Sequence, residues 1–273
     1  RFTRWLGAVL VASFLTFLNI LVRWIKWRYL CRRNGIRVPA KKGLGVYLAT
    51  LPAILTPFYI GELIRLTMLG IPVLVGMPRM IRIFLMERGA DVLALVFLLF
   101  LGRIPALLVL ILLFIGMPFL HKGWRRYGWS AAVVLSVLAW SLPVVSLAII
   151  GSLFGNGIDS QELAPLFARS TLLGGLTGLP MGAGVTGSSM LSGMIELDVP
   201  RQNAIWIITG FRMATTWFAL GIGFIALVMF LIKLRAAPGA SNHFDAIADQ
   251  YVEEIPEYIQ AHLLQRTCAR SYQ

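Results

Sequence analysis

The chain has 273 residues, of which 58% are hydrophobic and only 14% are charged, and its mean hydropathy is +0.78. A soluble domain carries roughly a quarter charged residues, so this composition excludes a soluble globular protein and, with several long apolar runs, indicates a multi-pass α-helical membrane protein. The net charge is +13, an excess that in a membrane protein sets topology and meets anionic lipid headgroups, so we expect no nucleic-acid partner.

The first apolar run, residues 5–22, predicts the first membrane span. It starts close to Arg1 and no Met precedes it, so we expect the natural protein to extend further at this end. A signal peptide is the alternative interpretation. The run lacks an A-x-A-like cleavage site, however, and its strongly basic segment follows the apolar residues instead of preceding them.

Three basic clusters predict the topology. The first follows the first span and contains no acidic residue; its members are Arg23, Lys26, Arg28, Arg32, Arg33, Arg37, Lys41 and Lys42. The second contains Lys122, Arg125 and Arg126, and the third contains Lys233 and Arg235. By the positive-inside rule all three face the cytoplasm. The chain must therefore cross the membrane an even number of times between consecutive clusters.

Four further apolar runs predict complete crossings: residues 79–101, 104–120, 129–154 and 204–232. With residues 5–22 they make about five full spans in the predicted transmembrane domain, residues 1–235. The loop that contains Asp159 and Glu162 has no basic residue and is expected on the external side.

Two apolar segments remain, residues 43–70 and 166–198, and Pro and Gly interrupt both of them midway. The parity of the crossings predicts that the first is a re-entrant helical hairpin from the cytoplasm and the second a re-entrant hairpin from outside. The predicted fold class is therefore an all-α polytopic membrane protein with two oppositely oriented hairpins, as in inverted-repeat transporters. Two kinked helices that are packed for structure alone are the alternative.

The hairpin interruptions contain candidate anion-binding backbone. Thr56 is a good N-cap and Pro57 a good first helical residue, while Gly182 and Gly184 leave the backbone bare ahead of a second half-helix. Both half-helices would point their N-termini at the bilayer centre, where they would suit a phosphate group. The glycine-rich stretch at 174–193 is expected to allow close helix packing.

Six charged residues fall within the apolar segments: Glu62, Arg65, Glu87, Arg88, Asp91 and Arg212. A charge at the bilayer centre costs about 2.5–3.5 kcal/mol on insertion scales. Glu62 and Arg65 are three residues apart and can pair on one helical face. These residues either bind a headgroup directly, form a structural ion-pair network or lie near the interface, whereas Arg79, Arg82 and Arg103 are expected to mark interfaces.

Enzymatic chemistry has little support. The three histidines are scattered, and Cys31 and Cys268 lie far apart, so we expect neither a metal site nor a disulfide framework. The chain contains no P-loop and no G-x-S-x-G motif. We expect no catalytic site and no cofactor within these residues, and a membrane-embedded synthase is the least supported function.

Four motifs suggest a family. The stretch "TPFYIGELIR" resembles the T-P-x-x-x-G-E-x-x-R signature of the lysylphosphatidylglycerol synthase transmembrane, flippase-like family. "ERGADVLALVFLL" resembles its E-R-x-x-D segment, "LPMGAGVTG" its P-x-G-x-G-V motif and "FRMATTW" its R-x-x-T-x-W span. The motifs occur in the family's order, and the resemblance covers roughly residues 5–235.

The resemblance implies a flippase-like transporter of the plasma membrane. Its lipid partner would have a polar or anionic headgroup, such as aminoacylated phosphatidylglycerol or a polyprenyl-phosphate-linked sugar. The lipid-binding residues that it implies are Thr56, Pro57, Gly61, Glu62, Arg65, Glu87, Arg88, Asp91, Pro180, Gly182, Gly184 and Arg212. One departure is that Thr186 and Gly187 follow the P-x-G-x-G-V motif, where many members have an acidic residue. A cationic headgroup is therefore in question.

The C-terminal part reads differently. Residues 236–242 are a predicted linker, and residues 243–273 a cytoplasmic tail with an apolar stripe at Ile247, Tyr251, Ile255, Ile259 and Leu263. The tail resembles the first helix of class I S-adenosylmethionine-dependent methyltransferases, and the chain ends before any cofactor loop. A membrane anchor that presents a fused methyltransferase to lipid is thus the alternative function, and a plain amphipathic tail is the simplest interpretation.

Overall fold

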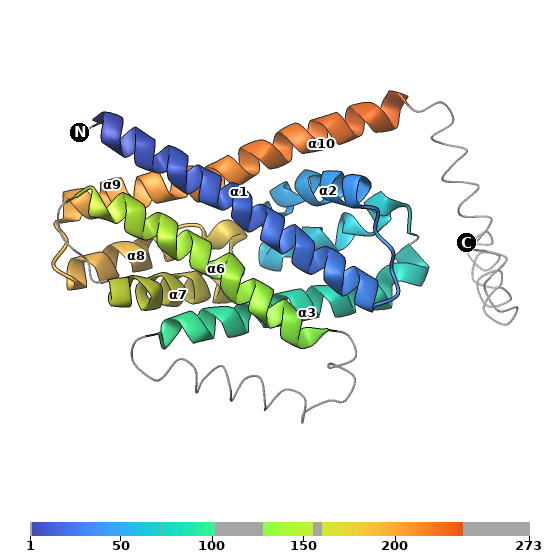
Figure 1. Cartoon of the computed structure of the whole chain (residues 1–273), viewed down its shortest axis with the longest axis horizontal. Coiled ribbons are helices and arrows are strands. Elements are labelled where there is room, and N and C mark those ends of the chain that lie inside the picture. The colour runs from blue at the N-terminus through green and yellow to red at the C-terminus, as the bar shows by residue number, and fades with distance from the viewer. Residues whose placement is uncertain (1, 72, 102–127, 155–159, 237–273) are drawn as a thin grey trace, which may run out of the picture.

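The structure, a computed structural model, describes residues 2–71, 73–101, 128–154 and 160–236. Every regular element within these ranges is a helix of the α, 3-10 or π type (Figure 1). The predicted all-α fold is therefore confirmed. The predicted span 104–120, the cluster at Lys122, the linker from residue 237 and the tail 243–273 lie outside the described residues.

Two long helices, α1 (Phe2–Arg33) and α6 (Trp129–Ser152), lie side by side through the molecule (Figure 1). They are antiparallel: Tyr29, near the end of α1, contacts Gly128, ahead of α6. Further along, Asn19 donates a hydrogen bond to the carbonyl of Ala139. Three described stretches are long and apolar enough to cross a membrane: Thr3–Arg33, Trp129–Ser152 and Arg201–Arg235.

Helix α3 (Val73–Leu99) packs against α6 and α7. It has 27 residues, which at 1.5 Å per residue is sufficient to span a bilayer. The Arg201–Arg235 stretch is one continuous rod of α9 (Arg201–Arg212), a π-helical turn η5 (Met213–Trp217) and α10 (Phe218–Ala236).

The first broken hairpin follows α1. Its elements are α2 (Ala40–Ala49), η1 (Leu51–Leu55), η2 (Pro57–Arg65) and η3 (Thr67–Leu69). The helix breaks at Thr50 and again at Thr56, beside the prolines that the sequence places there. The return arm is 3-10 rather than α-helical.

The second broken hairpin follows α6. It comprises α7 (Ser160–Leu176), η4 (Pro180–Gly182) and α8 (Val185–Glu196). The break falls on "GLPMGAG", as predicted. Gly193 lets α8 approach Leu166 of α7 closely, because a Cβ at that position would overlap the leucine side chain. This hairpin and the first one lie towards opposite ends of the molecule (Figure 1).

The two halves of the chain pack in a reciprocal way. Helix α3, which follows the first hairpin, packs against α7 of the second hairpin; α10, which follows the second hairpin, packs against α2 of the first. Each half of the chain therefore consists of a long helix, a broken hairpin and a second long helix. The second long helix of each half packs against the hairpin of the other half. This is the arrangement that an inverted repeat produces.

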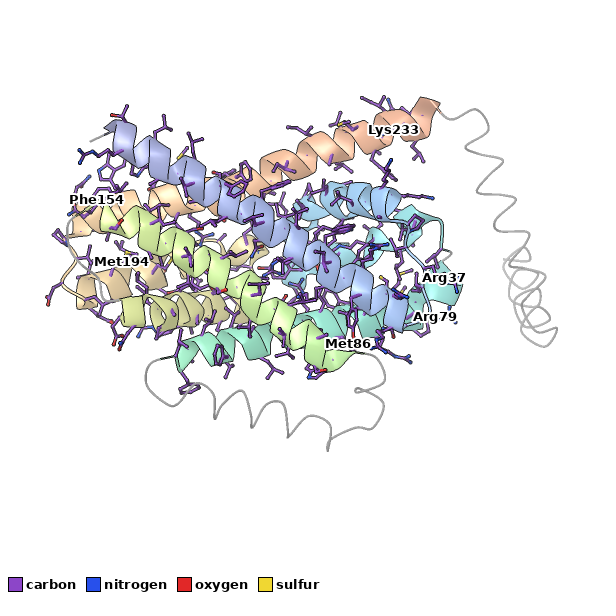
Figure 2. All side chains as sticks on the ribbon, in the orientation of Figure 1. Arg37, Arg79, Met86, Phe154, Met194 and Lys233 are labelled. Atoms are coloured by element: carbon purple, nitrogen blue, oxygen red, sulfur yellow. The ribbon has the colours of Figure 1, made fainter. Side chains whose placement is uncertain are left out.

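The two ends of the molecule differ in charge. Arg37, Arg79 and Lys233 lie at one end, and Phe154 and Met194 lie at the other (Figure 2). Arg32 and Arg33 in the last turn of α1 and Arg235 in the last turn of α10 extend the basic end. This end corresponds to the predicted cytoplasmic side.

Candidate functional site

The tip of the first hairpin departs from the predicted geometry. Thr56 is extended (φ −86°, ψ 145°), but Phe58 and Tyr59 then adopt left-handed conformations with φ of 51° and 60°. Element η2 begins at Pro57 with Thr56 as its N-cap, as predicted, but it is 3-10 helical and its regular geometry begins only after Tyr59. The sequence gives no warning, because bulky residues rarely adopt positive φ. Such strain is characteristic of functional sites.

Thr56 organises this tip through its hydroxyl. Oγ1 donates to the carbonyl of Ala53 at 2.6 Å and accepts from the N–H of Gly61 at 2.9 Å. It thus satisfies a backbone donor at the delayed start of the helix. A Cβ at position 61 would lie 3.0 Å from carbons of Ala53 and Thr56. The T-P-x-x-x-G spacing therefore has a physical basis: the hydroxyl needs a close approach that glycine permits.

The tip of the second hairpin repeats the same conformations. Leu179 is extended (φ −65°, ψ 141°), Pro180 follows, and Met181 and Gly182 are left-handed with φ of 55° and 61°. Gly184, with φ of 79°, is the N-cap of α8, which begins at Val185 as the glycines predicted. Extended residue, proline and two left-handed residues thus occur in the same order at both breaks.

The two tips are in contact. Element η4 touches both η1 and η2. The ring of Phe58 occupies the space in which Gly178 would carry a side chain, and Gly178 itself has a φ of 65°. The breaks at 50–65 and 177–184 therefore meet, although each belongs to a different half of the chain.

Behind the first tip, Arg65 joins two carboxylates. Its guanidinium lies 3.1 Å from Oε1 of Glu62 and 3.2 Å from Oε2 of Glu87. Its Nε donates to the hydroxyl of Thr50 at 3.0 Å, and the guanidinium also lies over the ring of Tyr47. The predicted Glu62–Arg65 pair is confirmed, and Arg65 extends it to the next helix.

Arg88 joins the other oxygen of Glu62. Its guanidinium lies 2.8 Å from Oε2 of Glu62 and 3.8 Å from Asp91, and it sits over the ring of Tyr59 at 5.1 Å. Its buried Nε has no hydrogen-bond partner among the described residues. The Arg88 side chain is 24% exposed, against 7% for Glu62 and 4% for Arg65.

Asp91 ties this group to α1. The Lys26 ammonium lies 2.6 Å away and the Arg23 guanidinium 3.2 Å away, and the Ser136 hydroxyl donates to the same carboxylate at 2.9 Å. Lys26 is completely buried. The prediction that Arg23 and Lys26 belong to a cytoplasmic basic surface is therefore wrong. Asn19, Arg23 and Lys26 recur at helical spacing, a signal that could have placed them on one interior face.

The seven side chains form one continuous ionic network: Arg23, Lys26, Glu62, Arg65, Glu87, Arg88 and Asp91. Every carboxylate in this network has a cationic partner. One of the predicted alternatives, a structural ion-pair network, therefore explains why these charged side chains lie together. Its four cations and three carboxylates leave one excess positive charge. Arg88 is the most exposed member and the one that contacts the hairpin tip.

Arg212 stands apart from this network. It ends α9, directly before the π-helical turn Met213–Trp217, is half-buried and interacts electrostatically with Tyr59. Within the described ranges it forms neither an ion pair nor a hydrogen bond. Single π-helical turns inside α-helical rods are frequent at functional sites. Tyr59 thus interacts with both Arg88 and Arg212.

A metal site has no support in the described part of the chain, where no group of three or more His, Cys, Asp or Glu side chains gathers. Cys31 is a buried free thiol, and Cys268 lies outside the described residues.

Residues 2–121 match the family model described as the lysylphosphatidylglycerol synthase TM region. This match confirms the family resemblance for a stretch that includes the first hairpin and the E-R-x-x-D segment. The motifs around Pro180 and Arg212 lie beyond the matched residues. Comparisons with curated proteins and with solved structures found no match.

Proposed function

We propose that this chain, which over residues 2–121 matches the lysylphosphatidylglycerol synthase TM region, moves a lipid with a polar or anionic headgroup across the plasma membrane. The family supports a multi-pass membrane protein with a lipid-related role. The observation that carries the proposal further is the meeting of the two hairpin tips beside an ionic network with one excess positive charge. Transport needs such a site, whereas a membrane anchor does not.

The hairpins are proposed to enter the membrane from opposite faces. Irregular backbone at membrane depth must be enclosed by protein or line a polar cavity. Protein covers part of the first tip, since Pro52 packs against Gly223 of α10 and Phe58 contacts Gly178, while the Phe58 side chain itself remains 58% exposed. Discontinuous segments in corresponding places of two halves mark midplane sites in transporters.

Arg88 and Arg212 are proposed to bind the headgroup phosphate. Arginine presents several donors in a planar fork that matches phosphate oxygens. Arg88 retains a buried Nε without a partner, and Arg212 has no carboxylate partner among the described residues. Glu62 and Asp91 hold Arg88 in place, and Arg65 links Glu62 to Glu87. Thr56, Pro57, Gly61, Pro180, Gly182 and Gly184 shape the two tips.

The substrate is proposed to be an anionic phospholipid or a polyprenyl-phosphate-linked lipid. The excess positive charge of the network favours a negative headgroup. The absence of an acidic side chain at Thr186 and Gly187, immediately after Gly184, removes a partner for a cationic headgroup such as lysylphosphatidylglycerol. The two tips share the same backbone conformations. This similarity suits a transport cycle in which the site opens alternately to the two sides of the membrane, with each hairpin controlling access from the side by which it enters.

Reconstituted proteoliposomes test the proposal. Phosphatidylglycerol and phosphatidylcholine with a fluorescent acyl chain are supplied in separate vesicles, and a membrane-impermeant quencher reports lipid in the outer leaflet. We expect the full chain to accelerate movement of phosphatidylglycerol more than phosphatidylcholine. The Arg88→Gln/Arg212→Gln variant should reduce this movement about tenfold, with Arg79→Gln as the control for an exposed arginine. Rates equal to those of protein-free vesicles would favour the anchor function instead.

A further inference from the structure

A small cavity lies between η2 and α3, next to the ionic network. Its lining includes Trp27, Glu62, Arg65, Phe84 and Glu87, and its volume is about 20 Å³. A volume of this size accommodates a single water molecule. Oε1 of Glu87 is buried and has no hydrogen-bond partner among the described residues. The cavity therefore provides room for one water next to Glu87, a carboxylate with unused hydrogen-bonding capacity.

Glu87 relies on a single cationic partner in the described part of the chain, whereas the neighbouring carboxylates have more than one. The charged or titratable groups that face it from the surrounding elements are Lys26, Cys31, Tyr47, Glu62, Arg65 and Arg88. Among the printed contacts of the described residues, only Arg65 pairs with Glu87 directly, at 3.2 Å. Asp91, by comparison, is held by Lys26, Arg23 and the Ser136 hydroxyl.

The ion pairs form a relay from the hairpin tip to this cavity. Arg88 and Arg65 share Glu62, and Arg65 is in turn shared by Glu62 and Glu87. A phosphate bound to Arg88 would compete with Glu62 for that guanidinium. Glu62 would then rely on Arg65, at the expense of the Arg65–Glu87 pair. A buried carboxylate that loses its cation is stabilised by taking up a proton.

We propose that Glu87 takes up one proton, through a water in this cavity, when an anionic lipid headgroup engages Arg88. This inference rests on the proposed function and names its coupling ion. The water donates its proton to Oε1 of Glu87, forming the carboxylic acid, and regains a proton from solvent. The network carries one excess positive charge, the phosphodiester cancels it and the proton restores it. Binding of the anion and uptake of the proton therefore support each other.

Proton uptake measured during lipid binding tests the inference. The purified full chain in weakly buffered detergent is titrated with dihexanoylphosphatidylglycerol while a pH indicator records proton uptake and calorimetry records binding. We expect up to one proton per bound lipid. Over the pH range in which binding takes up this proton, affinity should rise by as much as tenfold for each unit that the pH falls. Glu87→Gln keeps an acceptor for Arg65 but has no carboxylate to protonate, so the number of protons taken up per bound lipid should fall to zero in this variant. Glu196→Gln, at an exposed ion pair with Arg169, should behave as wild type.

The outcomes separate this inference from the proposed function. Lipid binding and transport without proton uptake, or uptake that survives in Glu87→Gln, would overturn the inference and leave the transport proposal intact. Absence of both lipid binding and transport would overturn both. In a further titration, inorganic phosphate replaces the lipid at the same concentration. Proton uptake equal to that with the lipid would overturn the assignment of the site to a lipid headgroup.

Discussion

Phe58 and Gly178 are in direct contact, so that the aromatic ring at the tip of the first hairpin fills the place of a side chain at the tip of the second. This contact joins segments from the two halves of the chain at the point where both are irregular. Arg88 and Arg212 both interact with Tyr59, the next residue after Phe58. The contact therefore connects the meeting of the hairpins with the proposed headgroup site.

Gly178→Ala should separate the tips. The alanine would be strained at a φ of 65° and would overlap the Phe58 ring, and overpacking of this kind costs about 1–3 kcal/mol. Thermal unfolding in detergent measures the loss. Gly175→Ala, in α7 with no atom near its would-be Cβ, should be nearly neutral. If Phe58→Ala fails to relieve the effect of Gly178→Ala in the double variant, the contact does not control the tip.

Thr56→Val should destabilise the first tip. The hydroxyl satisfies the Gly61 N–H and bonds to the Ala53 carbonyl, and an unsatisfied buried backbone donor costs about 1–3 kcal/mol. Thr56→Ser keeps the hydroxyl and should retain most of the stability. Both variants are compared by denaturant unfolding in mixed micelles. Equal stability of the valine and serine variants would show that the hydroxyl does not organise the turn.

Lys26→Met should destabilise the bundle strongly. Lys26 is fully buried against Asp91 and Ser136, and breaking a buried pair by removing one partner costs about 3–5 kcal/mol. The same unfolding measurement applies. Lys41→Met, at an exposed position, should change stability by less than about 0.5 kcal/mol. Adding Asp91→Asn to Lys26→Met should cost less than the two single changes together, whereas additive effects would argue against the pair.

Arg212→Gln separates ligand binding from structural support. Because Arg212 forms no ion pair or hydrogen bond within the described ranges, its replacement should leave stability within about 0.5 kcal/mol while reducing transport of anionic lipid severalfold. Arg65→Gln should instead lower stability, since it leaves Glu62 and Glu87 short of a cation. Unfolding and proteoliposome transport are measured on the same preparations. A strong loss of stability in Arg212→Gln would indicate a structural role.

Sequence alone anticipated the features that depend on local chemistry. Prolines and glycines mark both breaks, and the spacing of Glu62 and Arg65 predicted their pair. The apolar runs at 129–154 and 204–232 correspond to α6 and to the rod of α9, η5 and α10. These signals can be read within a few residues of one another, without knowledge of distant partners.

Features that depend on tertiary contacts were not anticipated. Lys26 and Arg23 read as surface charges, because their partner Asp91 lies on a different helix. The left-handed conformations of Phe58 and Tyr59 contradict local preference, and they coincide with the contacts of Phe58 with Gly178 and of Tyr59 with Arg88. Tertiary packing outweighed local propensity at this position.

Site-specific photo-cross-linking from position 59 tests the central claim most directly. Tyr59 is replaced by benzoylphenylalanine, and the full chain is irradiated in bilayers that contain radiolabelled phosphatidylglycerol. We predict a lipid adduct at position 59 that unlabelled phosphatidylglycerol displaces more effectively than phosphatidylcholine and that Arg88→Gln/Arg212→Gln abolishes. The same probe at Phe224, an exposed position on α10, serves as the reference for non-selective lipid contact. No adduct at position 59, or an adduct no more selective than that at Phe224, would contradict a headgroup site where the hairpins meet.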